Sequence, residues 1–201
     1  MDGLYKVLND KLLKTIQAAK LGRRTSLTLG DNKIKELPPE IGELVSLMDL
    51  DMSRNELETL PSEINNLKKL KRLGLNYQKF NLFPVAICSL KRLGELYLRG
   101  NKITAVPPEI GNLKNLTGLD LRGNRITHLP KEIIQLKNLK LLFLDGNPLV
   151  EPPLEIVVKG KDAIFSYFYT KYTNTTNIKP SQPNSLDTQS LENVTLYTKQ
   201  R

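Results

Sequence analysis

Residues 96–118 read LYLRGNKITAVPPEIGNLKNLTG, and the same pattern returns elsewhere in the chain. Rows of 23 residues align almost without gaps when they begin at Leu27, Leu50, Leu73, Leu96, Leu119 and Leu142. Each row opens with Leu, any residue, and then Leu or Met. Five rows carry Asn five positions after the first Leu, and the third row carries Gln78 there. So many shared columns indicate one repeated structural unit.

The columns of the repeat follow from the packing of stacked coils. Alternating Leu positions predict a short strand whose Leu side chains point inward and whose intervening side chains point to solvent. Equivalent strands of successive rows should lie side by side in parallel. The Asn amide can pair loop backbone groups that would otherwise be buried without a partner. A Leu-Pro or Val-Pro step then suits an irregular or short helical return, and the E-I-x-x-L-x-x-L stretch presents its apolar residues to the same core.

The third row departs from this pattern. It has Gln78 in the Asn column, Phe80 in an Ile or Leu column, and Phe83-Pro84-Val85-Ala86 where other rows have L-P-x-E. Gln is one methylene longer than Asn, so we expect that it fails to reproduce the Asn hydrogen bonds and that the loop is locally rearranged. Tolerated drift is one interpretation of this row, and a partner-specific bump is the other.

The segments that flank the repeats should cover the terminal coils, because an uncovered coil leaves apolar surface in water. Residues 1–26 predict an N-terminal capping helix with a stripe of Leu, Val, Ile and Ala at helical spacing. A helix that lies on a membrane surface is the alternative, since the same segment carries Lys6, Lys11, Lys14 and Lys20. Residues 158–172 predict a C-terminal capping helix, and residues 173–201 predict a disordered polar tail.

The composition restricts the class of protein. The 201 residues hold 37 Leu but no Trp and only 6% aromatic residues, which favours one repeated aliphatic packing unit. A single cysteine excludes intrachain disulfides and multi-Cys zinc sites, and it suggests a reducing compartment. No apolar run is long enough to cross a bilayer, and the first twenty residues lack the apolar stretch of a signal peptide. We therefore expect a cytoplasmic protein.

The net charge of +9 is spread over both ends and the middle of the chain. A nucleic-acid reader usually concentrates its charge on one face and interleaves aromatic residues for stacking. Lys68, Lys91, Lys114 and Lys137 recur every 23 residues and should stack along one rim. This column is either a common solvent position or a track for an acidic or phosphate-bearing partner. We expect nucleic acid and membrane to be disfavoured as partners.

The repeat resembles the leucine-rich repeat family, in its 23-residue variant with an L-P-x-E-I return, over residues 27–157. It is most similar to intracellular Ras-group repeats, such as those of Ras–Raf scaffold proteins, their plant relatives and the segment before the GTPase core of Roco proteins. The resemblance implies an α/β solenoid, a right-handed curved horseshoe with a parallel concave sheet. Six 23-residue repeats would lie between the helical caps. The sequence contains no G-x-x-x-x-G-K-[ST] phosphate loop, so GTPase activity is not carried over.

No constellation of catalytic residues stands out in the sequence. The single histidine, His128, falls in a variable column before Leu129-Pro130 and is expected to be an exposed loop residue. Cys88 lies just after the return Ile, where a small residue is tolerated, and no base accompanies it. We therefore expect a protein that is not an enzyme, with no catalytic residue, no cofactor and no metal site.

The even strand positions are the strongest candidates for binding, because they face the concave side and have no structural task in the repeat. Tyr97 and Phe143 place large aromatics in exposed columns, while Arg99 and Arg122 stack one coil apart. Arg and aromatic side chains often anchor protein interfaces. The predicted partner-binding residues are Asp49, Asp51, Arg54, Tyr77, Glu95, Tyr97, Arg99, Asp120, Arg122, Phe143 and Asp145.

These observations predict a monomeric, non-catalytic module that binds a protein on its concave face. The family resemblance implies a scaffold or regulator in small-GTPase signalling, with a small GTPase or a kinase-pathway component as partner. One alternative is a recognition arm of a multidomain enzyme such as a Roco GTPase. Another is a basic binder of nucleic acid or anionic membrane, whose binding would weaken steeply with salt.

Overall fold

The computed structural model describes the backbone of residues 2–173 and the side chains of residues 9–172. Six strands form one sheet in the order β1 to β6, and all neighbouring strands are parallel. Their bounds are β1 (Ser26–Thr28), β2 (Asp49–Asp51), β3 (Arg72–Gly74), β4 (Glu95–Tyr97), β5 (Gly118–Asp120) and β6 (Leu141–Phe143). The register pairs residues that lie one row apart, such as Leu50 with Leu73. The predicted α/β solenoid with a parallel sheet is confirmed.

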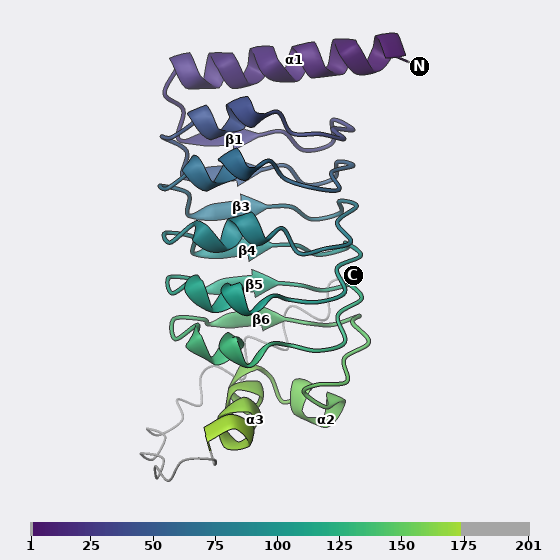
Figure 1. Cartoon of the computed structure of the whole chain (residues 1–201), viewed down its shortest axis with the longest axis vertical. Helices are drawn as coiled ribbons and strands as arrows, with labels where there is room; N and C mark the ends of the chain where they lie inside the picture. The colour runs from purple at the N-terminus through teal and green to yellow at the C-terminus, as the bar shows by residue number, and fades with distance from the viewer. Residues whose placement is uncertain (1, 174–201) are drawn as a thin grey trace, which may run out of the picture.

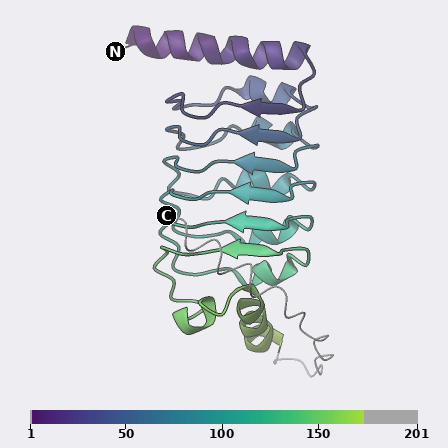
Figure 2. The ribbon, with the colours of Figure 1, turned by 180° about the vertical axis from the view of Figure 1, so that it is seen from behind.

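A short 3₁₀ helix follows each of the first five strands and runs along the opposite side of the coil (Figure 1). The five are η1 (Pro39–Glu43), η2 (Ser62–Asn66), η3 (Val85–Ser89), η4 (Pro108–Asn112) and η5 (Lys131–Gln135). Each follows a proline, whose fixed φ suits the start of a helical turn. Figure 2 shows the other side of the molecule, where no described helix crosses the strands.

The core lies between the strands and the 3₁₀ helices, and Leu and Ile dominate it. Leu50, Leu73 and Leu96, the central residues of three strands, are all 0% exposed. Burying one such side chain contributes about 1.5–3 kcal/mol. Each coil shares this apolar surface with the coils above and below it, so the stability of the solenoid depends on stacking.

The Asn column joins each coil to the one before it. Asn124 Nδ2 donates to Leu98 O, 26 residues earlier, and to Leu121 O, both at 2.9 Å. Its Oδ1 accepts from Ile103 N at 3.1 Å. Asn55, Asn101 and Asn147 make equivalent bonds. The amides therefore form a ladder through the buried side of the loops.

Gln78 largely continues this ladder. Its Nε2 donates to Met52 O at 2.6 Å, and its Oε1 accepts from Leu57 N at 3.0 Å. These are the same two bonds to the preceding coil that an Asn makes. The prediction that Gln fails to reproduce the Asn bonds is therefore wrong for them. The extra methylene changes only the bond within its own coil, where Nε2 donates to Asn76 O at 3.4 Å.

Helices lie at both ends of the solenoid. The long helix α1 (Asp2–Leu21) packs on η1 and buries Leu12, Ile16 and Ala19. At the other end, α2 (Leu154–Val157) precedes α3 (Lys161–Thr173), which packs on η5. None of the described helices is long and apolar enough to span a membrane. The predicted polar tail lies, from residue 174 onward, outside the described residues.

Replacing Asn124 with Ala should lower the free energy of unfolding by about 2–4 kcal/mol, because buried groups of two coils lose their partner. Asn32→Ala is the matched control. Asn32 occupies the same column in the first coil and is exposed, and its side-chain amide donates to Gly30 O within its own coil. Its substitution should change stability by about 0.5 kcal/mol or less. Urea unfolding measures both values, and equal losses would show that the ladder does not stabilise the stack.

Candidate functional site

The first and third residues of each strand lie on the outer side of the sheet, and we call these twelve residues the sheet face. They are Ser26, Thr28, Asp49, Asp51, Arg72, Gly74, Glu95, Tyr97, Gly118, Asp120, Leu141 and Phe143. Six of the eleven predicted binding residues lie on this face. The other five were predicted as strand positions, and that placement is wrong. Because each strand is only three residues long, they lie in the turns beyond the strand ends: Arg54, Tyr77, Arg99, Arg122 and Asp145.

These turns form what we call the outgoing rim. It consists of the two residues before the Asn column in each coil from the second onward: Ser53, Arg54, Asn76, Tyr77, Arg99, Gly100, Arg122, Gly123, Asp145 and Gly146. The second residue of every pair has a positive φ, from 53° at Tyr77 to 72° at Gly146. Glycine adopts this conformation readily, whereas other residues strain by about 1–2 kcal/mol. Arg54 and Tyr77 carry that strain.

A charged cluster occupies the sheet face between β2 and β4. Arg72 Nε lies 3.6 Å from Asp49 Oδ2 and 3.4 Å from Glu95 Oε2. The Tyr97 hydroxyl donates to Glu95 Oε2 at 2.6 Å. The pKa of Tyr97 is raised to about 12. Partial burial is the largest cause, and the hydrogen bond to Glu95 and the negative charge of Glu95 add to it. The phenol is therefore neutral at physiological pH and remains a hydrogen-bond donor.

Asp120 was predicted to be exposed on the binding surface, but the structure buries its side chain. It is 4% exposed and lies between Tyr97 and Phe143, its partners in the strand register. Arg122 covers it: Nε lies 3.0 Å from Oδ1, and the backbone N donates to the same oxygen at 3.0 Å. The hydrogen bond to Asp120 also raises the pKa of Arg122. Asp120 is therefore a structural residue.

The premise that these positions have no structural task is wrong for a second carboxylate. Asp51 Oδ1 accepts from Ser53 N at 2.9 Å, which fixes the turn after β2 as Asp120 fixes the turn after β5. A short Asp side chain commonly pairs with the backbone two residues on. The D-x-[SR] spacing in the sequence was the signal that could have identified both.

Gly74 creates a hollow on the sheet face that sequence reasoning did not identify. A cavity of about 450 Å³ lies there, lined by Ser26, Thr28, Asp49, Asp51, Ser53, Arg72, Gly74, Asn76 and Tyr97. A β-carbon on Gly74 would stand 2.5 Å from Asp51 Oδ1, so the carboxylate occupies the space that a side chain would need. Glycine in a column of larger residues was the sequence signal for this hollow.

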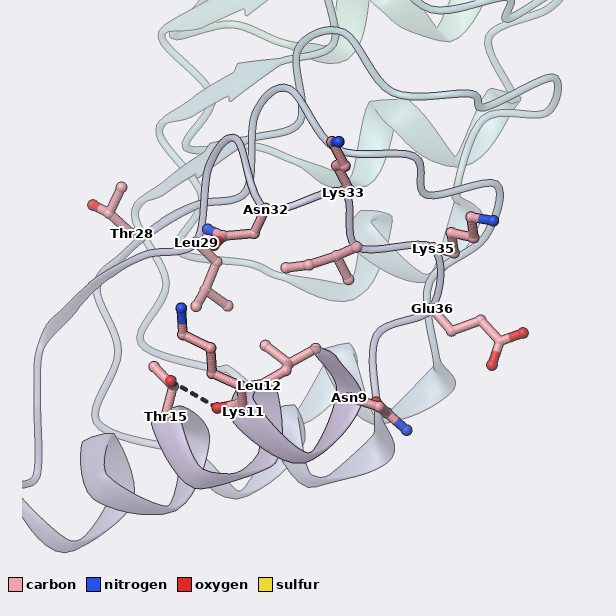
Figure 3. Close-up of a pocket in the computed structure, with 11 residues that line it drawn as sticks. Asn9, Lys11, Leu12, Thr15, Thr28, Leu29, Asn32, Lys33, Lys35 and Glu36 are labelled. Atoms are coloured by element: carbon pink, nitrogen blue, oxygen red, sulfur yellow. Dashed lines mark hydrogen bonds between the residues drawn. The ribbon is translucent and has the colours of Figure 1, made fainter. Parts of the chain in front are cut away.

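A second cavity, of about 220 Å³, lies between α1 and the first coil (Figure 3). Its lining includes apolar Leu12, Leu29 and Ile34 together with Lys11 and Lys33. Among the described residues of its lining, Glu36 supplies the carboxylate, and Lys11, Lys33 and Lys35 supply the cations.

The residues considered for catalysis lie apart from both cavities. His128 is exposed, as predicted, and its Nδ1 lies 3.0 Å from Thr127 Oγ1. Cys88 is buried, and this burial raises the pKa of its thiol to about 12. It is therefore a protonated thiol at physiological pH rather than a nucleophilic thiolate. Within the described residues, no three His, Cys, Asp or Glu side chains gather as a metal site.

Removing the guanidinium above Asp120 should destabilise the fold, since a buried carboxylate loses its charged partner. We expect Arg122→Ala to lower the free energy of unfolding by about 1–3 kcal/mol. Arg99→Ala, one coil earlier, is the matched control, because Arg99 is exposed and forms no ion pair among the described side chains. It should cost about 0.5 kcal/mol or less. Urea unfolding in parallel would contradict this assignment if the two losses were the same.

Two family models match the sequence, a leucine-rich-repeat region over residues 11–99 and a leucine-rich repeat over residues 91–149. No curated protein matches it. Among solved structures, a leucine-rich-repeat protein of Leptospira interrogans is 40% identical with a TM-score of 0.52, over 61% of this chain and 37% of its own. The plant peptide hormone receptor RGFR1, solved in complex with RGF2, is 32% identical with a TM-score of 0.57.

The match to RGFR1 covers 62% of this chain but only 21% of the RGFR1 chain. The ectodomain of the Arabidopsis thaliana receptor kinase SOBIR1 is 30% identical with a TM-score of 0.54, and the match covers 61% of this chain and 70% of that one. Domains of this kind are generally protein-interaction modules. The repeat columns, the parallel sheet of stacked coils and these likenesses together show that the chain belongs to the leucine-rich repeat family.

Proposed function

We propose that the protein is a non-catalytic interaction module that binds a protein partner on the sheet face. The observation that carries this proposal is a sheet face of mixed chemistry that no described helix covers (Figure 2). Leu141 is 55% exposed there beside the half-buried aromatic ring of Phe143. Apolar anchors surrounded by charged groups are typical of protein interfaces. The RGFR1 complex with RGF2 supports a peptide or protein as the class of partner.

The preorganisation of this face supports the same proposal. Asp51 and Asp120 hold the turns after their strands, and Arg72 lies between two carboxylates. The ion pairs of Arg72 are exposed at the surface and contribute little to stability. They do hold side chains in place, which lowers the entropy lost when a partner binds. The carboxylates on the face oppose a polyanion, so this surface favours a protein over nucleic acid.

For the partner we propose a component of small-GTPase or kinase signalling, with this protein as scaffold or regulator. The support is the resemblance of the L-P-x-E-I repeats to the Ras-group type. A recognition arm of a larger protein is the alternative, since this chain spans 37% of the Leptospira protein and 21% of RGFR1. We also propose that the chain comprises six repeats, with α1 and α3 as their caps.

Substitutions on the sheet face should abolish capture of the partner from a native lysate. We expect Leu141→Asp with Asp49→Lys to reduce the captured partner at least about tenfold, because both changes alter the proposed contact surface. The matched control is Leu82→Asp with Glu109→Lys. These residues are exposed outside the sheet face, so the same chemistry is changed elsewhere.

Mass spectrometry of the captured proteins provides the readout, and thermal unfolding checks that all variants fold. A partner that survives the sheet-face changes but not the control changes would contradict the proposal. Arg122 is left intact, because its loss would expose Asp120 and confuse an effect on binding with an effect on stability.

We propose a cytoplasmic, monomeric protein. The single free cysteine, Cys88, supports a reducing compartment, in which a free thiol persists. Fractionation of cells should recover the protein with cytosolic markers, and size-exclusion chromatography with light scattering should give a mass near 22.8 kDa. Recovery with membranes or in the medium would contradict the localisation, and twice that mass would contradict the monomer.

A further inference from the structure

We infer that Arg54, Tyr77 and Arg99, which we call the rim clamp, bind an acidic side chain of the protein partner. The inference rests on the proposed function, because it assigns a chemistry to one end of the same surface. The three residues come from successive coils and meet on the outgoing rim. Arg54 Cζ lies 5.6 Å from the centre of the Tyr77 ring, and Arg99 Cζ lies 5.8 Å from it.

The backbone beneath the rim clamp holds Arg54 and Tyr77 in a strained conformation with positive φ. Arg54 and Tyr77 have φ values of 59° and 53°, in a column where three later coils use glycine. A strained conformation persists only where the surrounding structure imposes it, and such residues often lie at ligand sites. A β-carbon on Gly100 would stand only 2.6 Å from Cε1 of Tyr77, so the ring lies directly against the backbone of the next coil.

The two guanidinium groups of the clamp differ from their neighbours on the same surface. Arg72 and Arg122 each pair with carboxylates. Among the described side chains, Arg54 and Arg99 form no ion pair, and both guanidinium groups lie over the Tyr77 ring. Contact with an aromatic face orients a guanidinium at little cost to its hydrogen-bond donors. The clamp therefore presents two guanidinium groups that no described carboxylate pairs.

A carboxylate is the group that best complements these donors. Arg binds carboxylate through paired N–H···O bonds, which are stronger than neutral hydrogen bonds. Asp49, Asp51 and Glu95 lie on the adjoining sheet face, so an extended polyanion would be repelled where one or two acidic side chains would fit. The clamp thus favours an acidic position within a protein segment, next to parts of the partner that contact the sheet face.

The test uses a ten-residue Ser-Gly peptide with two adjacent central Glu residues as the probe. Titration into the full-length, ¹⁵N-labelled protein should shift the Nε–Hε resonances of Arg54 and Arg99 in a saturable manner. The double variant Arg54→Gln with Arg99→Gln should weaken binding about tenfold or more. Lys68→Gln with Lys91→Gln removes the same charge from another rim and should weaken binding by about threefold or less.

Two further measurements test whether the rim clamp binds the carboxylate group and whether the Tyr77 ring is needed. A peptide with Gln in place of both Glu residues should not shift the Arg resonances, and a shift of equal size would overturn the carboxylate assignment. Tyr77→Gly introduces the residue that three other coils use at this position, so it should fold with an unchanged or higher melting temperature. It should nonetheless lose several-fold in affinity. Unchanged affinity in this variant would overturn the role of the ring.

The outcome is separable from that of the proposed function. If the Leu141 and Asp49 changes abolish partner capture while the Glu peptide does not shift the Arg54 and Arg99 resonances, the inference fails and the proposed function stands. If the peptide binds at the clamp while those same changes leave partner capture intact, the sheet face is not the interface. Equal weakening by the Arg and Lys double variants would reduce the effect to net charge and overturn the inference.

Discussion

A single coil of this protein cannot bury its own apolar side or pair its own loop amides, and the rest of the structure depends on that constraint. Leu and Ile side chains become inaccessible only when a second coil lies against the first. The Asn ladder adds a directional requirement, because each amide bonds a carbonyl in its own coil and another in the coil before it. The two effects together fix both the spacing and the register of the stack.

The binding surface is a consequence of this stacking. Backbone pairing places the strands side by side (Figure 2), and the outward residues of six coils therefore belong to one sheet surface. Turns after the strands are fixed by the same ladder, which holds the outgoing rim at the edge of that face. The interior of each coil is therefore committed to stability, while its outward columns differ in chemistry from coil to coil and take part in stability only where, as at Asp51 and Asp120, a side chain holds a turn. Arg72 between two carboxylates, the hollow at Gly74 and the rim clamp are three results of that variation.

Asp120, Gln78 and the outgoing rim show where sequence reasoning had a limit. Asp120 stands in an outward column, yet its neighbours Tyr97 and Phe143 and the guanidinium of Arg122 bury it. Gln78 retained the bonds to the preceding coil because its longer side chain could adapt to the loop. The positive φ values of Arg54 and Tyr77 could be inferred only from glycine in the same column of other rows.

The 23-residue period by itself predicted the stack of repeated coils, the parallel sheet and the inward Leu columns. Periodicity suffices for these properties because rows that share their inward residues pack on one another in the same way. Only the tertiary structure decided which outward charges are paired and which are not. Arg72 and Arg122 meet carboxylates, whereas Arg54 and Arg99 meet a tyrosine ring. The physical reason is that such pairing depends on side-chain geometry between coils, and the sequence states only which residues stand one row apart.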